Sequence, residues 1–400
     1  PSSCGRIADN GASRQVGARK VDQVKKPAFW LILILLVYAF TEIGSYTALI
    51  LLRAVRGIEY IPISAASISP RHKDILENLL AGKTTYVGFS STLGWTIKPN
   101  GFAPRYRANS AGIRANREFA LHPPRSTLRV AAFGDSFTHA DDVETKDTWQ
   151  EVLMRTHERV EVLNFGVGGY GLDQAFLRYR QDGVRFNPDI VLIGFMSENI
   201  YRTVSVYRPF YAPVTNLPLA KPWFTIQNDA LVLMDNPTPT LSHYRELLTH
   251  PESVLPRLGA HDHFFHTWYK QGTMDFLPSL RLFKIARYRI LAPRSGIEKS
   301  GVYATDSHAF KITAAVFELF FESARRNGSL PIALIFPSDR DIARFRAKGT
   351  KRYAPLLDHL QAKGLPYIDL LDGFETQGNR VPVDALAPDH YSPLGNQLVR

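Results

Sequence analysis

An alternation of short apolar runs with longer helical segments is the strongest constraint on the fold of this chain. The runs rich in apolar and β-branched residues predict strands at 128–133, 160–164, 190–195, 330–336 and 366–370. The segments between them predict helices near 149–157, 172–182, 309–326 and 353–362. Strands separated by helices in this way indicate a parallel sheet covered by helices on both faces. We therefore expect an α/β fold, a three-layer α/β/α sandwich of the flavodoxin-like class.

A long apolar segment at residues 28–55 sets the second constraint, because it is sufficient to cross a bilayer of about 30 Å as a helix. Glu42 is the only acid inside it, and a carboxylate at that depth costs about 2.5 to 3.5 kcal/mol. We expect Glu42 to pair with a partner or to be protonated. A cleaved signal peptide and a buried core helix are the alternatives. The segment is longer than a signal-peptide apolar region, and only a weak cleavage site follows near Ser64-Ala65-Ala66, which favours a retained anchor.

Basic residues are slightly more frequent before the apolar segment than after it. Those that precede it include Arg14, Arg19, Lys20, Lys25 and Lys26, and those at its end or after it include Arg53, Arg56, Arg71 and Lys73. Cytoplasmic flanks carry the excess of Lys and Arg in membrane proteins. This pattern predicts a cytoplasmic tail at 1–27, and places the remainder of the chain on the extracytoplasmic side, in a periplasm or at a cell surface.

The rest of the chain divides into a lead-in and a catalytic domain. Residues 56–127 are rich in turn-forming residues between short runs, which predicts irregular β-hairpins. Residues 128–400 carry the strand and helix alternation. Residues 201–307 interrupt that alternation and are rich in Pro, His and aromatics. An insertion of this length in an α/β unit is usually functional, which predicts a lid or a binding wall.

The composition is that of a globular protein, with 45% apolar and 21% charged residues. The formal net charge of +11 could suggest a nucleic-acid partner, but the basic residues are scattered among acids and form no stripe interleaved with aromatics. We therefore expect no nucleic-acid partner. Cys4 is the only cysteine, so an internal disulfide is excluded.

Residues with hydrolytic chemistry follow the first three predicted strands. Gly134-Asp135-Ser136 follows the first strand, Gly168-Gly169 the second and Ser197-Glu198-Asn199 the third, while Asp389-His390 lies near the end of the chain. Ligands of open parallel sheets bind where the carboxyl ends of the strands leave a crevice. An ester hydrolase needs a nucleophile, a base and donors to the developing oxyanion. The nucleophile would be Ser136 and the base His390. The oxyanion donors would be the N–H groups of Ser136 and Gly169 and the side-chain amide of Asn199.

These four blocks, in this order, resemble the SGNH (GDSL-type) hydrolase superfamily. The resemblance implies the roles of nucleophile for Ser136, oxyanion donors for Gly169 and Asn199, and base for His390. Two positions depart from the family pattern: Ser197-Glu198-Asn199-Ile200 replaces the usual Gly-x-Asn-Asp, and Ala387 stands where the family has an Asp three residues before the His. We expect Asp389 to orient His390, while Asp384, a main-chain carbonyl or a Ser-His dyad remain open.

Each of these residues also has a simpler interpretation. Ser136 and Asn199 could cap helices, Gly169 could serve a tight turn, and His390 could lie in a surface turn. His261, His263 and His266 with Asp262 have a spacing that could ligate zinc. Short His-rich loops are mostly solvated surface, so we expect no metal and no cofactor.

The sequence therefore favours a membrane-anchored serine esterase that removes O-acyl groups, in particular O-acetyl, from an extracytoplasmic carbohydrate. An acylated glycan or a small ester would be its substrate. An O-acyltransferase that passes the same acyl group to a glycan hydroxyl is the first alternative, and exclusion of water would distinguish the two. An inactive glycan-binding or assembly module is the second alternative, which Ala387 motivates.

Overall fold

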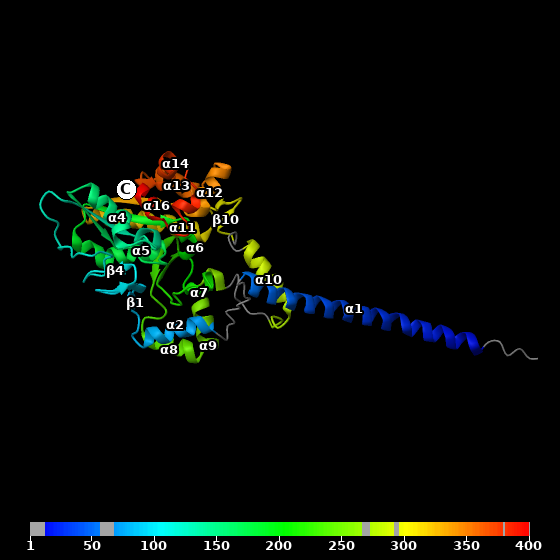
Figure 1. Cartoon of the computed structure of the whole chain (residues 1–400). Coiled ribbons are helices and arrows are strands. Elements are labelled where there is room, and N and C mark those ends of the chain that lie inside the picture. Colours follow the sequence, from blue (N-terminus) through cyan, green and yellow to red (C-terminus); the bar gives the residue numbers. More distant parts are fainter. Residues whose placement is uncertain (1–12, 57–67, 266–272, 292–295, 379–380, 400) are drawn as a thin grey trace, which may run out of the picture. The chain divides into compact units, whose positions relative to one another are not determined.

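The computed structural model describes residues 13–56, 68–265, 273–291, 296–378 and 381–399 (Figure 1). It comprises two compact units. We call Pro1–Tyr60 with Gly272–Ile290 the anchor unit, and Ile61–Gln271 with Leu291–Arg400 the globular unit. The weak cleavage site near Ser64-Ala65-Ala66 lies outside the described residues.

The centre of the globular unit is a parallel sheet. Its strands are β5 (Leu128–Phe133), β6 (Val160–Asn164), β7 (Ile190–Met196), β12 (Leu330–Phe336) and β13 (Tyr367–Asp369). They lie in the order β13-β12-β7-β5-β6, and every neighbouring pair is parallel. Since β6 and β7 flank β5 on opposite sides, the chain changes direction across the sheet at β5. Such a switch point leaves a crevice at the carboxyl ends of the strands, where ligands bind.

Helices cover both faces of this sheet, as predicted (Figure 1). On one face α4 (Trp149–Thr156) packs on β6 and α14 (Leu370–Gly378) on β12, with α16 (Pro393–Val399) against both helices. On the other face α5 (Leu172–Arg178) packs on β7 and α11 (His308–Arg326) on β12, and these two helices contact each other. The expected α/β/α sandwich is confirmed.

The element boundaries follow the sequence pattern closely. The strands predicted at 128–133, 160–164 and 330–336 have these limits in the structure. The predicted helix at 172–182 is divided, because α5 ends at Arg178 and is followed by one π-helical turn, η2 (Tyr179–Gly183), and the 3₁₀ turn η3 (Val184–Phe186). The remaining elements near the sheet are α3 (Ser136–His139), η1 (Thr145–Asp147), α12 (Asp339–Lys348), α13 (Ala354–Ala362) and α15 (Val383–Leu386).

The lead-in contains the two expected hairpins and one helix that the sequence reasoning missed. The hairpins pair β1 (Val87–Ser90) with β2 (Gly94–Ile97), and β3 (Phe102–Ala103) with β4 (Tyr106–Arg107). The missed helix is α2 (Pro70–Leu80). The start of this helix could have been predicted from the sequence, because serine followed by proline is a common helix start. In the structure the Ser69 hydroxyl accepts a hydrogen bond from the His72 N–H.

The insertion has regular structure of its own. Its elements are α6 (Asn199–Arg202), α7 (Arg208–Tyr211), the hairpin β8 (Trp223–Gln227) and β9 (Ala230–Met234), α8 (Leu241–Thr249), α9 (Pro251–Gly259), α10 (Pro278–Leu291), and the hairpin β10 (Glu298–Lys299) and β11 (Val302–Tyr303). Asp262 is buried and accepts hydrogen bonds from main-chain N–H groups of Val206 and Phe264, so it ties two segments of the insertion together.

These contacts bear on the histidine cluster of the insertion. The carboxylate of Asp262 is occupied by main-chain donors, and burial raises its pKa to about 6. The His261 ring stacks on Trp223, and the His263 ring packs edge-on against Phe264. His266 lies outside the described residues. The described members of the cluster therefore serve packing and main-chain hydrogen bonding.

The anchor unit contains α1 (Ser13–Arg56) and most of α10. Within α1, residues Lys26–Val55 are long and apolar enough to cross a membrane, as judged from length and composition. The expectation that Glu42 pairs with a partner is confirmed: its carboxylate accepts the Ser279 main-chain N–H at 3.0 Å and the Ser279 hydroxyl at 2.5 Å.

Candidate active site

Ser136 is the first residue of α3, which begins directly beyond the end of β5. The helix cap is the preceding residue, because the Asp135 carboxylate accepts the Phe137 N–H at 2.9 Å. The Ser136 hydroxyl is therefore not used as a cap, and it donates to no side chain in the part of the chain that the structure describes. Its position at the switch point, between the ends of β5 and β7, fits a nucleophile.

Asp135 fixes the start of this short helix. It is fully buried and forms an ion pair with Arg202 of α6 at 3.2 Å. Burial raises the pKa of Asp135, and the Arg202 guanidinium opposes that effect. The ion pair between Arg202 and Asp135 joins the segment after β7 to the segment after β5. Arg202 also contacts Glu198 of its own segment at 3.1 Å.

Gly169 lies in the loop after β6 with φ +80, a conformation that favours glycine. The two carbonyls around its N–H are held by side chains: Trp95 Nε1 donates to the Gly168 carbonyl at 3.0 Å, and Arg208 Nη1 donates to the Gly169 carbonyl at 2.7 Å. The Gly168 carbonyl and the Gly169 N–H belong to one planar peptide and point in opposite directions. Trp95 of β2 therefore sets the direction of the Gly169 N–H.

Asn199 begins α6, immediately after the end of β7. The residue is 1% exposed, and neither its amide nitrogen nor its amide oxygen has a hydrogen-bond partner among the described residues. It is therefore not a helix cap. A buried amide without partners costs free energy, and such groups are rare unless a ligand or water satisfies them. Its place between the ends of neighbouring strands suits a donor to substrate.

His390 lies in the loop before α16 and packs beside α3. Its ring is 5.2 Å from the ring of Phe137, the residue that follows Ser136. Its Nδ1 is 2.8 Å from a carboxylate oxygen of Asp142. A carboxylate at Nδ1 fixes the tautomer that leaves Nε2 as the proton acceptor, which is the arrangement of a general base.

The carboxylate that bonds His390 is not the one that we expected. Asp389 Oδ2 lies 3.9 Å from His390 Nδ1, beyond hydrogen-bonding distance, and its side chain is 89% exposed. Asp142 makes the hydrogen bond instead. Asp384 lies in the short helix α15, and no contact joins it to His390 among the described residues. Spacing in the last sequence block could not reveal this, because Asp142 comes from the loop after α3.

A second imidazole, His139 at the end of α3, has a different environment. Its Nδ1 bonds the Asp141 carboxylate and its Nε2 is 2.6 Å from the Tyr86 hydroxyl, so both ring nitrogens are occupied. Burial, assisted by the Arg114 guanidinium, lowers the pKa of His139 to about 4. His139 is 2% exposed and neutral at pH 7. It is therefore a structural group, although it is closer to Ser136 in sequence than His390 is.

Arg114 of the lead-in supports the loop that carries these acids. It is 3% exposed and donates to the carbonyls of His139, Ala140 and Val143 at 2.6, 2.5 and 2.6 Å. The loop contains two non-glycine residues with left-handed backbone, Ala140 at φ 64 and Asp142 at φ 70. Such conformations are unfavourable for alanine and need support from surrounding contacts. Arg114 supplies that support through its bonds to the carbonyls of His139, Ala140 and Val143.

One group of side chains with possible metal-ligand atoms lies at this loop. Ligand atoms of Asp142, Asp389 and His390 lie within 4.8 Å of one another, and both carboxylates are exposed. Within this group, His390 Nδ1 is bonded to Asp142.

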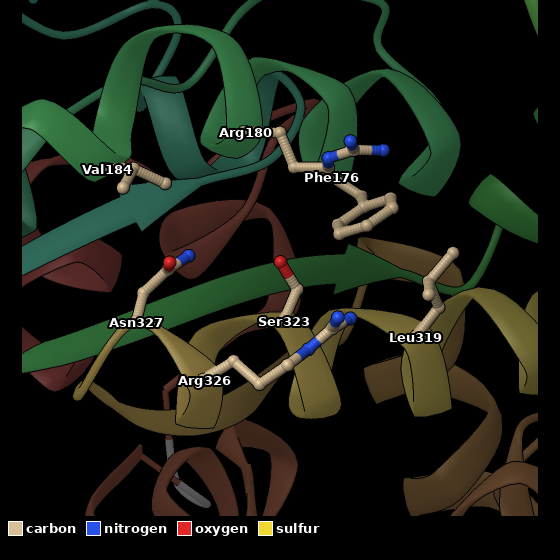
Figure 2. Close-up of a pocket in the computed structure, with 7 residues that line it drawn as sticks. All are labelled: Phe176, Arg180, Val184, Leu319, Ser323, Arg326 and Asn327. Atoms are coloured by element: carbon tan, nitrogen blue, oxygen red, sulfur yellow. The ribbon is translucent and has the colours of Figure 1, made fainter.

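A separate hollow of about 510 Å³ lies between the α5, η2 and η3 segment and α11 (Figure 2). Phe176, Val184 and Leu319 provide its apolar wall. Ser323 has its hydroxyl in this hollow, which no candidate site residue lines. No histidine is among the residues that line this hollow. Ser323 is therefore a suitable control for substitutions of Ser136.

Comparisons with known proteins gave structural matches only. No protein-family model matches the chain, and no curated protein is significantly similar to it. Among solved structures, the chain is similar to a protein described as a lipolytic protein of the G-D-S-L family from Desulfitobacterium hafniense DCB-2, with 14% identity, a TM-score of 0.34, and coverage of 68% of this chain and 95% of that one.

Two further structures give comparable values. A member of the lipolytic protein G-D-S-L family from Veillonella parvula DSM 2008 has 12% identity and a TM-score of 0.34 over 68% of this chain and 94% of that one. The acetyl xylan esterase AlAXEase has 12% identity and a TM-score of 0.34 over 68% of this chain and 96% of that one. The function proposed next rests on the geometry of the site.

Proposed function

We propose that the chain is a membrane-anchored serine esterase that removes O-acyl groups, in particular O-acetyl, from an extracytoplasmic carbohydrate. The observation that carries the proposal is the buried, unpartnered amide of Asn199, which follows β7 and so lies beside β5, the strand that leads to Ser136. A buried amide without partners does not stabilise the core, whereas a free amide N–H can donate to the oxyanion that develops during ester hydrolysis.

The reaction uses each candidate residue in one role. Ser136 Oγ attacks the ester carbonyl carbon while His390 Nε2 takes its proton, and Asp142 holds the imidazole in position. The N–H groups of Ser136 and Gly169 and the Asn199 amide stabilise the negative oxygen. His390 then gives the proton to the departing alkoxide, which leaves an acyl group on Ser136. Water, activated by His390, releases the acid and restores the serine.

The Asp142 contact weakens the alternative of an inactive module. That alternative was motivated by Ala387, which removes the carboxylate that the resembled family uses to orient the histidine. Here the hydrogen bond at Nδ1 comes from Asp142 at 2.8 Å, so the pair is complete without position 387. The carbohydrate class comes from the resemblance to the SGNH superfamily and from the proposed extracytoplasmic location.

Acetate release by the full chain in detergent tests the proposal. We expect acetate from an O-acetylated oligosaccharide and from a simple acetyl ester with the wild type and with Ser323→Ala, and none above background with Ser136→Ala. Activity in Ser136→Ala equal to the wild type would contradict the proposal. Transfer of acetyl to an added oligosaccharide in excess of acetate release would assign the site to an O-acyltransferase.

A further inference from the structure

The anchor unit exposes apolar side chains outside α1. In the described part of that unit, Met274, Phe276 and Phe283 are 51, 65 and 61% exposed. All three fall within residues 274–283, whereas the strongly exposed large apolar residues of the globular unit are scattered along its sequence. A local concentration of exposed aromatic and apolar side chains marks an interaction surface.

This segment is attached to α1 by a specific contact. Ser279 lies in the first turn of α10, where main-chain N–H groups have no helical partner, and the Glu42 carboxylate accepts both its N–H and its hydroxyl. A carboxylate at a helix N-terminus is also favoured by the helix dipole. Glu42 therefore acts as the cap of α10, and the two helices lie together in Figure 1.

The two halves of the apolar part of α1 differ in exposure. Every residue from Phe29 to Phe40 is exposed. From Glu42 onward one side is covered, at Glu42, Ser45, Leu49 and Leu52. That spacing places the covered residues on one face of the helix. The first half thus offers only an apolar surface suited to lipid, whereas one face of the second half is packed within the anchor unit and its other face is exposed.

The position of Glu42 sets the depth of the contact. A helix needs about 20 residues to cross the hydrocarbon layer, so a span that begins after Lys26 ends near Tyr46. Glu42 then lies about 6 Å, or about one turn, below that boundary. The N-terminal turn of α10 is consequently held at the depth where hydrocarbon gives way to headgroups.

The charge of the segment suits the same depth. Residues 273–287 contain three basic residues, Arg281, Lys284 and Arg287, and one acid, Asp275. Asp275 is 3% exposed, and its carboxylate forms an ion pair with Lys284. Basic and aromatic residues together are typical of segments that lie in the interface of a bilayer with anionic lipids.

We propose that residues 273–287 form a second membrane contact, an interfacial segment that inserts Met274, Phe276 and Phe283 into the bilayer beside α1. This inference rests on the membrane span of the proposed function and adds a second point of attachment to it. The occupant of the exposed apolar side chains is lipid. Glu42 is the residue that holds the interfacial segment against the span.

Fluorescent depth probes in the full chain test the inference. In a Cys4→Ser background, single cysteines replace Phe283, Met274, Leu33 of α1, or Leu330, which is 52% exposed in the globular unit. Each cysteine carries an environment-sensitive fluorophore, and the proteins are reconstituted into vesicles of phosphatidylcholine and phosphatidylglycerol. Quenching is measured with aqueous iodide, with lipids labelled near the headgroup, and with lipids labelled at the acyl-chain end.

We expect the probes at 283 and 274 to be quenched most by the headgroup-proximal label, with iodide quenching several-fold weaker than at 330. The probe at 33 should respond most to the chain-end label. If iodide quenches the probes at 283 and 274 as strongly as the probe at 330, while the probe at 33 still responds to the lipid labels, the interfacial segment is contradicted. The membrane span of α1 would be unaffected by that result. Aqueous behaviour at 33 as well would remove the anchor and the inference together.

Discussion

Two histidines within the same region of the globular unit show how local contacts decide a residue's role. His139 has both ring nitrogens bonded, to Asp141 and Tyr86, whereas His390 has Asp142 at Nδ1 and no described partner at Nε2. Only an imidazole with a free nitrogen can take a proton from the nucleophile. The same reasoning applies to Asn199, because both polar atoms of its buried amide are without a described partner.

Replacing the two candidate acids one at a time tests the orienter. We expect Asp142→Asn to lower kcat by about 10²-fold or more, because the amide no longer fixes the required tautomer of His390. Asp389→Asn should leave kcat close to the wild-type value, since Asp389 does not bond the ring. The opposite ranking of the two variants in ester hydrolysis would return the role to Asp389.

Removing the Asn199 amide should separate catalysis from stability. We expect Asn199→Ala to lower kcat by about 10²-fold or more through loss of an oxyanion donor, with little change in KM. Because the amide has no described partner, its removal orphans no other group, and the free energy of unfolding should fall by less than about 1 kcal/mol. Full activity in this variant would exclude the oxyanion role.

At the scale of elements, the lead-in contributes directly to the geometry of the site. Trp95 of β2 holds the Gly168 carbonyl, and Arg114 holds three carbonyls at the end of α3 and in the loop that follows. Both side chains are buried. The lead-in, through Trp95 and Arg114, thus positions residues that follow β5 and β6.

A pair of identical substitutions tests the role of Trp95. Trp95→Phe removes the donor to Gly168 and leaves a buried carbonyl without it, so we expect a loss of about 1 to 3 kcal/mol in unfolding free energy. A misdirected Gly169 N–H should also lower kcat about tenfold, which corresponds to about 1.4 kcal/mol in activation free energy. The control is Trp149→Phe.

Trp149 is similarly buried, but its indole N–H has no described partner. Its replacement should therefore alter packing and leave kcat unchanged. Equal effects of the two substitutions on kcat would mean that the Trp95 hydrogen bond does not direct the Gly169 N–H.

The pKa of His139 predicts how the stability of this region depends on pH. The folded value is about 4, below the ordinary value of 6.5, so the unfolded chain binds more protons between these limits. Stability from this group is complete above pH 6.5 and is lost as pH falls through about 4, a change of up to about 3 kcal/mol. Unfolding free energies across this window should fall less steeply for His139→Gln than for the wild type; equal slopes would contradict the assignment.

At the scale of the whole molecule, the sequence predicts the strands of the sheet well. It predicts only some of the contacts between the candidate site residues. Buried parallel strands are continuous apolar runs, so β5, β6 and β12 were located to the residue. The ends of these strands then predict Ser136, Gly169 and Asn199 as site residues, and their roles stay predictions. The orienting acid could not be found in this way, because the Asp142 carboxylate reaches His390 only through the left-handed turn after α3.

Trapping the acyl-enzyme is the most direct measurement of the central claim, that Ser136 is a nucleophile activated by His390. The full chain is incubated with a fluorophosphonate, digested, and the modified peptide is identified by mass spectrometry. We predict a single adduct on Ser136, formed at least about 10²-fold more slowly in His390→Ala, since general-base assistance contributes a factor of that order. An adduct on another serine, or an unchanged rate in His390→Ala, would contradict the account.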